Sequence, residues 1–195
     1  MLFRRLCVFC GSYTGRRPAY RAAAERLGLL LVERGIELVY GGGNIGLMGV
    51  LADTILARGG RAIGVIPESL MAKEVGHTGL TELRIVNSMH ERKAVMSDLA
   101  DGFIALPGGF GTLEEFCEVV TWSQLGLQSK PCGLLNVESY YAPLLELFDH
   151  AVREGFLHEK NRRLVLDDED PARLLEKLKV FRSEPTAKWI EREER

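Results

Sequence analysis

The chain reads Glu37-Leu38-Val39-Tyr40-Gly41-Gly42-Gly43-Asn44-Ile45-Gly46 where a short apolar run meets a cluster of glycines. An apolar run of four residues that ends in glycines is typical of a buried strand followed by a tight turn. Downstream, Leu47, Leu51 and Ile55 recur at four-residue spacing and form one apolar side of a helix that reaches Arg58. The stretch therefore predicts a strand, a glycine-rich turn and a helix.

The same unit recurs on both sides of this stretch. Further strands are predicted at 6–10, 61–66, 83–86, 102–106, 132–135 and 164–166. Further helices are predicted at 18–34, 89–100, 112–125, 139–154 and 171–179, the last of them capped by Asp170. Apolar strands that alternate with helices favour a parallel sheet covered on both faces. We therefore expect an α/β fold with a single-domain, doubly wound, Rossmann-like sheet over residues 1–180. A charged tail is predicted at 181–195, in which Trp189 and Ile190 are available to dock on a neighbouring molecule.

Length, composition and charge exclude several classes of protein. The 195 residues are 46% hydrophobic and 27% charged, which suits one globular domain. With 25 Lys and Arg against 27 Asp and Glu, the chain lacks the positive charge that nucleic acid or an anionic membrane attracts. No apolar run reaches the roughly 20 residues of a membrane span, and the N-terminus lacks the order of a signal peptide. We expect a cytoplasmic protein that binds neither nucleic acid nor membrane.

The four cysteines include a C-x-x-C pair, Cys7 and Cys10. A structural zinc site would need two more close ligands, and the sequence has no second C-x-x-C and no H-x-x-x-H. We therefore interpret Cys7 and Cys10 as small apolar residues of a buried strand, and we expect no metal site.

Three turns that follow predicted strands are rich in small residues. Glycine lets backbone N–H groups approach an anion closely, and the helix behind each turn adds a positive dipole end. Ligands of such sheets bind outside the carboxyl ends of the strands. The alternative is that the glycines only allow tight turns and close packing. The candidate phosphate-binding residues in these turns are Gly11, Ser12, Gly42, Gly43, Gly108, Gly109, Gly111 and Thr112.

Residues 41–46 also fit the dinucleotide pattern G-x-G-x-x-G. The pattern follows the second predicted strand, however, and no acidic residue ends the next strand, so NAD(P) binding is disfavoured. The P-loop pattern G-x-x-x-x-G-K-[ST] is absent from the sequence, which disfavours a P-loop nucleotide hydrolase.

The third turn, Pro107-Gly108-Gly109-Phe110-Gly111-Thr112-Leu113-Glu114-Glu115, is the most informative. Thr112 and Glu115 have the spacing of a capping box, in which Thr112 caps the helix. Alternatively, the Glu115 carboxylate lies beside a bound anion and needs a cation to offset it. Arg92 and Lys93 supply positive charge near the start of another helix, and this charge serves either a bound phosphate or Glu115. Alternatively, both residues belong to a solvated helix face.

Taken together, these motifs resemble those of the LOG (Lonely Guy) family of cytokinin-activating nucleotide hydrolases, long labelled lysine decarboxylase-like. The resemblance runs from about residue 6 to residue 179. Its most specific part is the P-G-G-x-G-T-x-x-E motif at 107–115 together with the preceding Arg92-Lys93. The other motifs are Cys7-Val8-Phe9-Cys10-Gly11-Ser12, Val39-Tyr40-Gly41-Gly42-Gly43, Gly46-Leu47-Met48-Gly49, Gly64-Val65-Ile66-Pro67, Met89-His90-Glu91, Thr121-Trp122 and Lys130-Pro131.

The resemblance implies an enzyme that cleaves the N-glycosidic bond of an adenine-type nucleoside 5′-monophosphate, either a cytokinin riboside 5′-monophosphate or AMP. The products would be the free base and ribose 5-phosphate, and no cofactor would be required. Arg92 and Glu115 match the family's essential pair. The resemblance also implies a homodimer whose active site lies near the subunit interface. The positions that match substrate-binding residues are Glu74, Lys93, Gly108 to Glu114, and Thr121.

Three alternative functions also have to be weighed against these motifs. Molybdenum-cofactor carrier proteins look similar in fold and glycine turns, so a carrier without catalysis is the main alternative. A lysine decarboxylase would need pyridoxal phosphate on a lysine. Lys93 is the only lysine in the motifs that supply candidate catalytic or binding residues. A single-stranded DNA binder of related fold gains no support from a net charge of −2.

Overall fold

The computed structural model describes residues 3–71 and 76–182. It contains one seven-stranded parallel sheet of order β4-β3-β2-β1-β5-β6-β7. The strands are β1 (Arg5–Phe9), β2 (Glu37–Tyr40), β3 (Ala62–Pro67), β4 (Glu82–Val86), β5 (Phe103–Ala105), β6 (Cys132–Leu135) and β7 (Val165–Asp168). The helices are α1 (Pro18–Glu33), α2 (Gly46–Ala57), α3 (Glu68–Met71), α4 (Met89–Leu99), α5 (Phe110–Gln124), the 3₁₀ turn η1 (Val137–Ser139), α6 (Ala142–Arg153), α7 (Glu159–Arg162) and α8 (Pro171–Val180).

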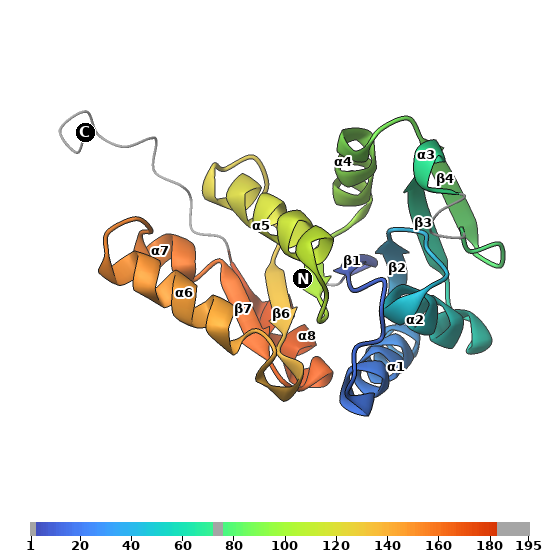
Figure 1. Ribbon diagram of the computed structural model, residues 1–195, viewed down its shortest axis with the longest axis horizontal. Coiled ribbons are helices and arrows are strands. Elements are labelled where there is room, and N and C mark those ends of the chain that lie inside the picture. The colour runs from blue at the N-terminus through green and yellow to red at the C-terminus, as the bar shows by residue number, and fades with distance from the viewer. Residues whose placement is uncertain (1–2, 72–75, 183–195) are drawn as a thin grey trace.

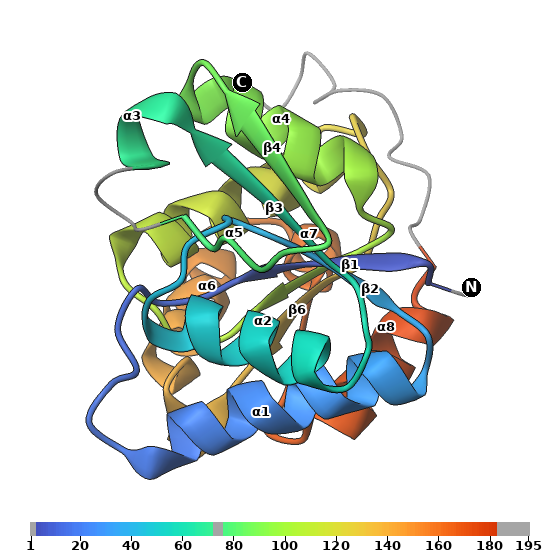
Figure 2. The ribbon, with the colours of Figure 1, turned by 90° about the vertical axis from the view of Figure 1, so that its right-hand side faces the viewer.

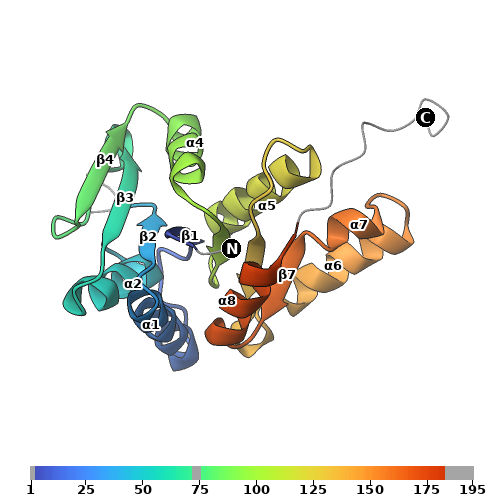
Figure 3. The same ribbon diagram turned by 180° about the vertical axis from the view of Figure 1, so that it is seen from behind.

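Helices cover both faces of the sheet, as the sequence predicts. Helices α1, α2 and α8 pack on one face, and α4, α5 and α6 lie on the other (Figure 1). The same two layers are seen from the side in Figure 2 and from behind in Figure 3. Each face has its own apolar core, because every buried strand residue points to one side or the other. The α/β, doubly wound expectation is therefore confirmed.

The strand order reverses between β1 and β5, which lie side by side at the centre of the sheet. Cys7 of β1 pairs with Val39 of β2 on one side and with Phe103 of β5 on the other. From β1 the chain adds strands in one direction and then, after β4, in the other. Ligands of open α/β sheets bind at such a reversal, outside the carboxyl ends of the strands.

The two cysteines of the C-x-x-C pair lie on opposite faces of the sheet. Cys7 belongs to the core under α4 and α5, whereas Cys10 belongs to the core under α1 and α2. Both thiols are free and buried. The interpretation as small apolar residues of a buried strand is confirmed, and this spacing is no redox pair.

Most predicted helix ends agree with the structure to within a residue or two, and one cap is wrong. Asp170 caps α8 as predicted, since its side chain accepts hydrogen bonds from the N–H groups of Ala172 and Arg173. Thr112 does not cap α5: the helix begins two residues earlier, because Gly109 takes the extended N-cap conformation. Glu115 is therefore a second-turn residue and no member of a capping box.

Two segments depart from the predicted pattern. The helix predicted over 139–154 begins at Ala142, after the turn η1, and the short helix α7 was not predicted. Residues 183–195, which include Trp189 and Ile190 of the predicted tail, lie outside the described residues. Within the part of the chain that is described, no helix is long and apolar enough to cross a membrane.

Candidate active site

Three loops meet where the strand order reverses. The loop after β1 is tied to the loop after β5, because the Gly11 N–H donates to the Pro107 carbonyl at 3.1 Å. It is also tied to the start of α2, because the Leu47 N–H donates to the Gly11 carbonyl at 3.0 Å. A donor at the start of α2 is therefore used by the chain's own loop, which agrees with the disfavoured dinucleotide reading of residues 41–46.

A pocket of about 420 Å³ opens between these loops. That volume falls within the usual range for small-ligand sites. Nine of the residues predicted for the site line it: Gly11, Ser12, Arg92, Gly108, Gly109, Phe110, Gly111, Thr112 and Glu115. Residues that are distant in the sequence, on α4 and α5 and in the loops after β1 and β5, therefore meet in one pocket.

Arg92 reaches the pocket from the first turn of α4. Ser88 caps this helix, since its hydroxyl accepts a hydrogen bond from the Glu91 N–H at 3.1 Å. The Arg92 guanidinium is buried, and its Nη2 donates to the Gly41 carbonyl at 2.9 Å. A Cβ on Gly41 would lie only 1.9 Å from Nη2, so any other residue there would displace the guanidinium. The glycine turn after β2 thus makes room for a buried cation.

Glu115 reaches the same pocket from the second turn of α5 and is half-buried. Burial, followed by the negative charge of Glu115, raises the pKa of the Cys10 thiol well above its ordinary value. The pKa of Cys7 is raised for the same two reasons, and the Arg92 charge opposes that rise. The charges of Arg92 and Glu115 therefore both act on the cysteine in β1. The Cys10 thiol stays neutral in the pocket wall.

Gly108 and Thr112 shape the floor of the pocket. A Cβ on Gly108 would lie 2.1 Å from Thr112 Oγ1 and 2.9 Å from the Gly11 nitrogen. Thr112 is buried, so its hydroxyl is held against the loop rather than exposed to solvent. The first N–H groups of a helix have no partner within the helix, and those of α5 start at this loop. An anion in the pocket would meet these N–H groups.

Gly42 and Gly43, two predicted phosphate-binding residues, do not line this pocket. The Gly42 carbonyl accepts a hydrogen bond from the His77 N–H at 3.0 Å, and Gly43 pairs with Gly76. This turn therefore holds the segment that follows residues 72–75. Glu74, predicted for substrate binding, lies outside the described residues.

Lys93, Glu114 and Thr121 also lie outside the pocket lining. Lys93 Nζ forms ion pairs with the carboxylates of Glu114 and Glu118, the latter at 3.0 Å, and so joins α4 to α5. Burial lowers the pKa of Lys93, but the two carboxylates outweigh it and the net pKa is raised. The Thr121 hydroxyl donates to the Cys117 carbonyl within α5. Their roles toward a substrate stay predictions.

Several lining residues were not predicted from the sequence. Tyr13 is 84% exposed at the pocket, and Tyr20 and Tyr140 pack edge to face beside it. Tyr140 follows β6, the neighbour of β5, so the rule about carboxyl ends of strands applies to it as well. The aromatic pair Tyr140-Tyr141, five residues after a predicted strand, was the available signal.

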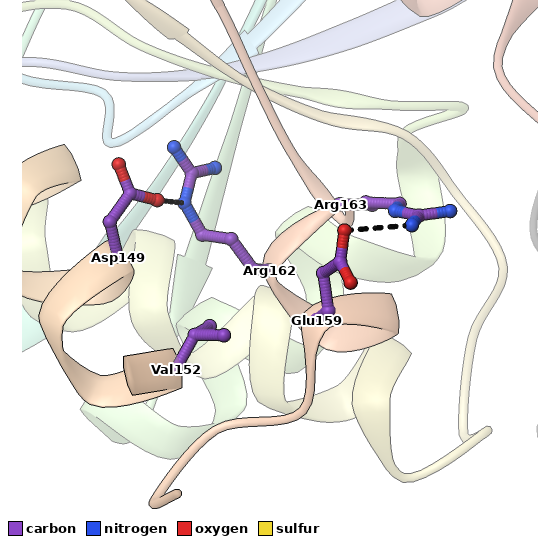
Figure 4. A pocket seen from close by; sticks show the side chains of 5 residues that line it. All are labelled: Asp149, Val152, Glu159, Arg162 and Arg163. Carbon is purple, nitrogen blue, oxygen red and sulfur yellow. Dashed lines mark hydrogen bonds and ion pairs between the residues drawn. The ribbon is translucent and has the colours of Figure 1, made fainter. Parts of the chain in front are cut away.

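A second hollow lies between α6 and α7 (Figure 4). Its charged side chains are already paired: Arg162 with Asp149 at 2.6 Å, and Arg163 with Glu159 at 2.9 Å. These pairs are local, and the hollow is far from the strand reversal in the sheet order. It offers no counterpart to the Arg92 and Glu115 pocket.

Comparison with known proteins identifies the family of this chain. Residues 48–178 match the family described as "Possible lysine decarboxylase". The cytokinin riboside 5′-monophosphate phosphoribohydrolase LOG of Oryza sativa subsp. japonica is 54% identical over 179 residues, covering 92% of this chain and 74% of that protein. The enzyme LOG7 of Arabidopsis thaliana is 49% identical over 182 residues, covering 93% and 84%.

The chain belongs to the LOG family. Solved structures show which proteins share the fold of this chain. The molybdenum cofactor binding protein of Rippkaea orientalis superposes with a TM-score of 0.67 at 22% identity, covering 90% of this chain and 94% of that one. The molybdenum cofactor carrier protein of Chlamydomonas reinhardtii gives 0.67 at 19% identity, covering 91% and 98%. At such identities the likeness extends to the fold alone.

Proposed function

We propose that this LOG-family chain hydrolyses the N-glycosidic bond of adenine-type nucleoside 5′-monophosphates to free base and ribose 5-phosphate. The observation that carries the proposal is the meeting of Arg92 and Glu115 with the glycine loop at 108–112 in one pocket. Family relatives that are about half identical carry the name of this activity. Cytokinin riboside 5′-monophosphates and AMP are the two candidate substrates.

The proposed chemistry needs a negative charge beside the sugar. Cleavage of a glycosidic bond builds oxocarbenium-like positive charge on the ribose, which a fixed carboxylate stabilises. Glu115 is the carboxylate that lines the pocket. It can also accept a proton from the water that attacks C1′. The bond from C1′ to the base nitrogen breaks, its electrons go to the base, and water supplies the new oxygen at C1′. The proton that the water loses ends on the base, which restores the Glu115 carboxylate.

Arg92 supplies the positive charge. The departing purine gains negative charge and is stabilised by a nearby cation or donor. Arg92 is anchored by the Gly41 carbonyl, so its guanidinium is already oriented before substrate binds. The same charge offsets the repulsion between Glu115 and a phosphate in one pocket. No step of this scheme is routed through a metal or cofactor.

The loop at 108–112 is proposed to bind the 5′-phosphate. Remote binding energy of this kind positions the sugar for attack without taking part in bond cleavage. We expect Thr112→Ala to raise KM for a 5′-monophosphate about tenfold to a hundredfold, the usual cost of one hydrogen bond to a charged group. The free nucleoside should react as poorly with the variant as with the wild type. Steady-state kinetics on both substrates checks this, with Thr112→Ser as the control that keeps the hydroxyl; an equal effect on both substrates contradicts the phosphate role.

A pyridoxal-phosphate lysine decarboxylase is disfavoured by the geometry of Lys93. A lysine that forms a Schiff base must lose its proton, and the carboxylates of Glu114 and Glu118 hold Lys93 protonated. Lys93 is also not among the residues that line the pocket. A molybdenum-cofactor carrier is the remaining alternative, supported by fold likeness alone.

Turnover of matched substrates tests the proposal. Purified protein is incubated with AMP and N6-isopentenyl-AMP, each beside its dephosphorylated nucleoside, and base release is timed. We expect base from the monophosphates and little from the nucleosides. The ratio of the two monophosphate rates then reports the base preference. No base from any of the four would favour the carrier.

We also propose that the chain forms a homodimer through the face that carries α4 and α5. Apolar side chains on this face, among them Val95, Val120 and Trp122, are only partly buried, and Leu127 after α5 is 71% exposed. A second copy would cover them. Light scattering is expected to give about twice the 21.7 kDa of one chain. Leu127→Asp should shift the mass toward the monomer, and a wild-type monomer at micromolar concentration contradicts the proposal.

A further inference from the structure

Three successive carbonyls of the loop after β5 are each held by a hydrogen bond. The Tyr141 hydroxyl donates to the Leu106 carbonyl at 2.6 Å, and the Gly11 N–H donates to the Pro107 carbonyl at 3.1 Å. The Tyr140 hydroxyl donates to the Gly108 carbonyl at 2.5 Å. The loop that enters α5 is therefore braced from β1 on one side and from the segment after β6 on the other.

The bond from Tyr140 is the one that orients the anion-binding end of the loop. The carbonyl and N–H of one trans peptide unit point in opposite directions. A fixed Gly108 carbonyl therefore fixes the direction of the Gly109 N–H. Gly109 is the N-cap of α5, with no side chain of its own to hold it. Without the Tyr140 hydroxyl, this peptide would be free to rotate.

The chain accepts backbone strain to bring Tyr140 there. Glu138 and Ser139, directly before it, have φ of 53° and 57°, in the left-handed region. For residues other than glycine this conformation costs roughly 1–2 kcal/mol each. Strain of this kind persists only where surrounding contacts impose it, and it gathers at functional sites. The ring of Tyr140 is fixed by edge-to-face contacts with Tyr20 at 5.9 Å and Tyr141 at 5.0 Å.

The two tyrosines differ in their surroundings. Tyr141 is 1% exposed and lies in the core, so its hydroxyl bond supports the fold. Tyr140 is 40% exposed and lines the pocket. Adjacent residues with the same chemistry thus offer a matched pair, one inside the core and one at the site.

We propose that Tyr140 is a positioning residue, which acts through the Gly108 carbonyl to hold the Gly109 N–H toward the phosphate of the substrate. The inference rests on the proposed function, since it names the group that pre-orients the phosphate loop. It predicts that Tyr140 affects binding of the phosphate-bearing part of the substrate, independent of the base. Preorganised donors gain affinity because they need no reordering when the anion binds.

The test compares Tyr140→Phe with Tyr141→Phe. For Tyr140→Phe we expect KM for AMP and Kd for ribose 5-phosphate to rise together by about fivefold to tenfold, the range of one hydrogen bond, with kcat within about twofold. Its melting temperature should stay close to wild type, because the ring is kept. For Tyr141→Phe we expect a lower melting temperature and an unchanged Kd for ribose 5-phosphate.

Unchanged KM and Kd in Tyr140→Phe would overturn the inference, and so would a loss confined to kcat. Equal weakening of adenosine and AMP would also overturn it, because adenosine carries no phosphate. The proposed function is judged separately by base release from wild-type protein. If wild type releases no base yet binds ribose 5-phosphate, that function falls, and the Kd of Tyr140→Phe for ribose 5-phosphate still decides the role of Tyr140.

Discussion

Glu115→Gln is expected to lower kcat for an adenine nucleoside 5′-monophosphate by about 10²–10⁴-fold, the range typical of a group in proton transfer or comparable electrostatic catalysis. Glutamine keeps the size of the side chain and its place on α5, so the fold should be unchanged. What it loses is the negative charge that opposes the charge on the ribose. Steady-state kinetics, with circular dichroism to check the fold, gives the result.

A nearby carboxylate offers the control for this variant. Glu118 lies one turn further along α5 and pairs with Lys93 rather than lining the pocket. We expect Glu118→Gln to change kcat by no more than a few-fold. If Glu115→Gln keeps full activity, Glu115 has no part in the mechanism. Equal losses in both variants would mean that charge on α5, and not the carboxylate in the pocket, is what matters.

Gly41→Ala is expected to lower kcat/KM by about 10²-fold or more, although residue 41 carries no reactive group. The new Cβ would lie 1.9 Å from Nη2 of Arg92, so the buried guanidinium must move. A displacement of about 1 Å at a positioned group can cost this much in rate. The displaced guanidinium also loses the Gly41 carbonyl as acceptor, so the melting temperature should fall.

A double-mutant cycle shows whether the effect of Gly41→Ala passes through Arg92. Kinetics are measured for Gly41→Ala, Arg92→Ala and the double variant. We expect Gly41→Ala to cost little further activity once Arg92 is gone. Additive losses would show that Gly41 acts by another route, for example through the β2 backbone.

The sequence predicts the order of strands and helices well, because each element has its own local pattern. The strand over residues 37–40 and the Asp170 cap of α8 agree with the structure, since a buried run bounded by glycines and an Asp-Pro helix start are both local signals. Thr112 shows the limit of such signals. It has the spacing of a cap, but Gly109, three residues earlier, takes that place in the structure.

The pocket is predicted in part, and the missing part depends on long-range contacts. Glycine turns after neighbouring strands indicate Gly11, Gly108 and Gly109 because the strand ends are known to meet at one edge. Spacing could not show that Gly41 makes room for Arg92, fifty-one residues further along the chain. Nor could it show that two left-handed residues aim Tyr140 at Gly108. Both contacts depend on how the strands pair in the folded sheet.

Product analysis of AMP incubated with wild-type protein shows which bond of the nucleotide the chain cleaves. Chromatography with mass detection follows adenine, adenosine, ribose 5-phosphate and inorganic phosphate over time, with Glu115→Gln in parallel. We expect adenine and ribose 5-phosphate in equal amounts from the wild type, and far slower release from the variant. Adenosine with inorganic phosphate, or unchanged AMP at high enzyme concentration, would contradict an N-glycosidic hydrolase built on Arg92 and Glu115.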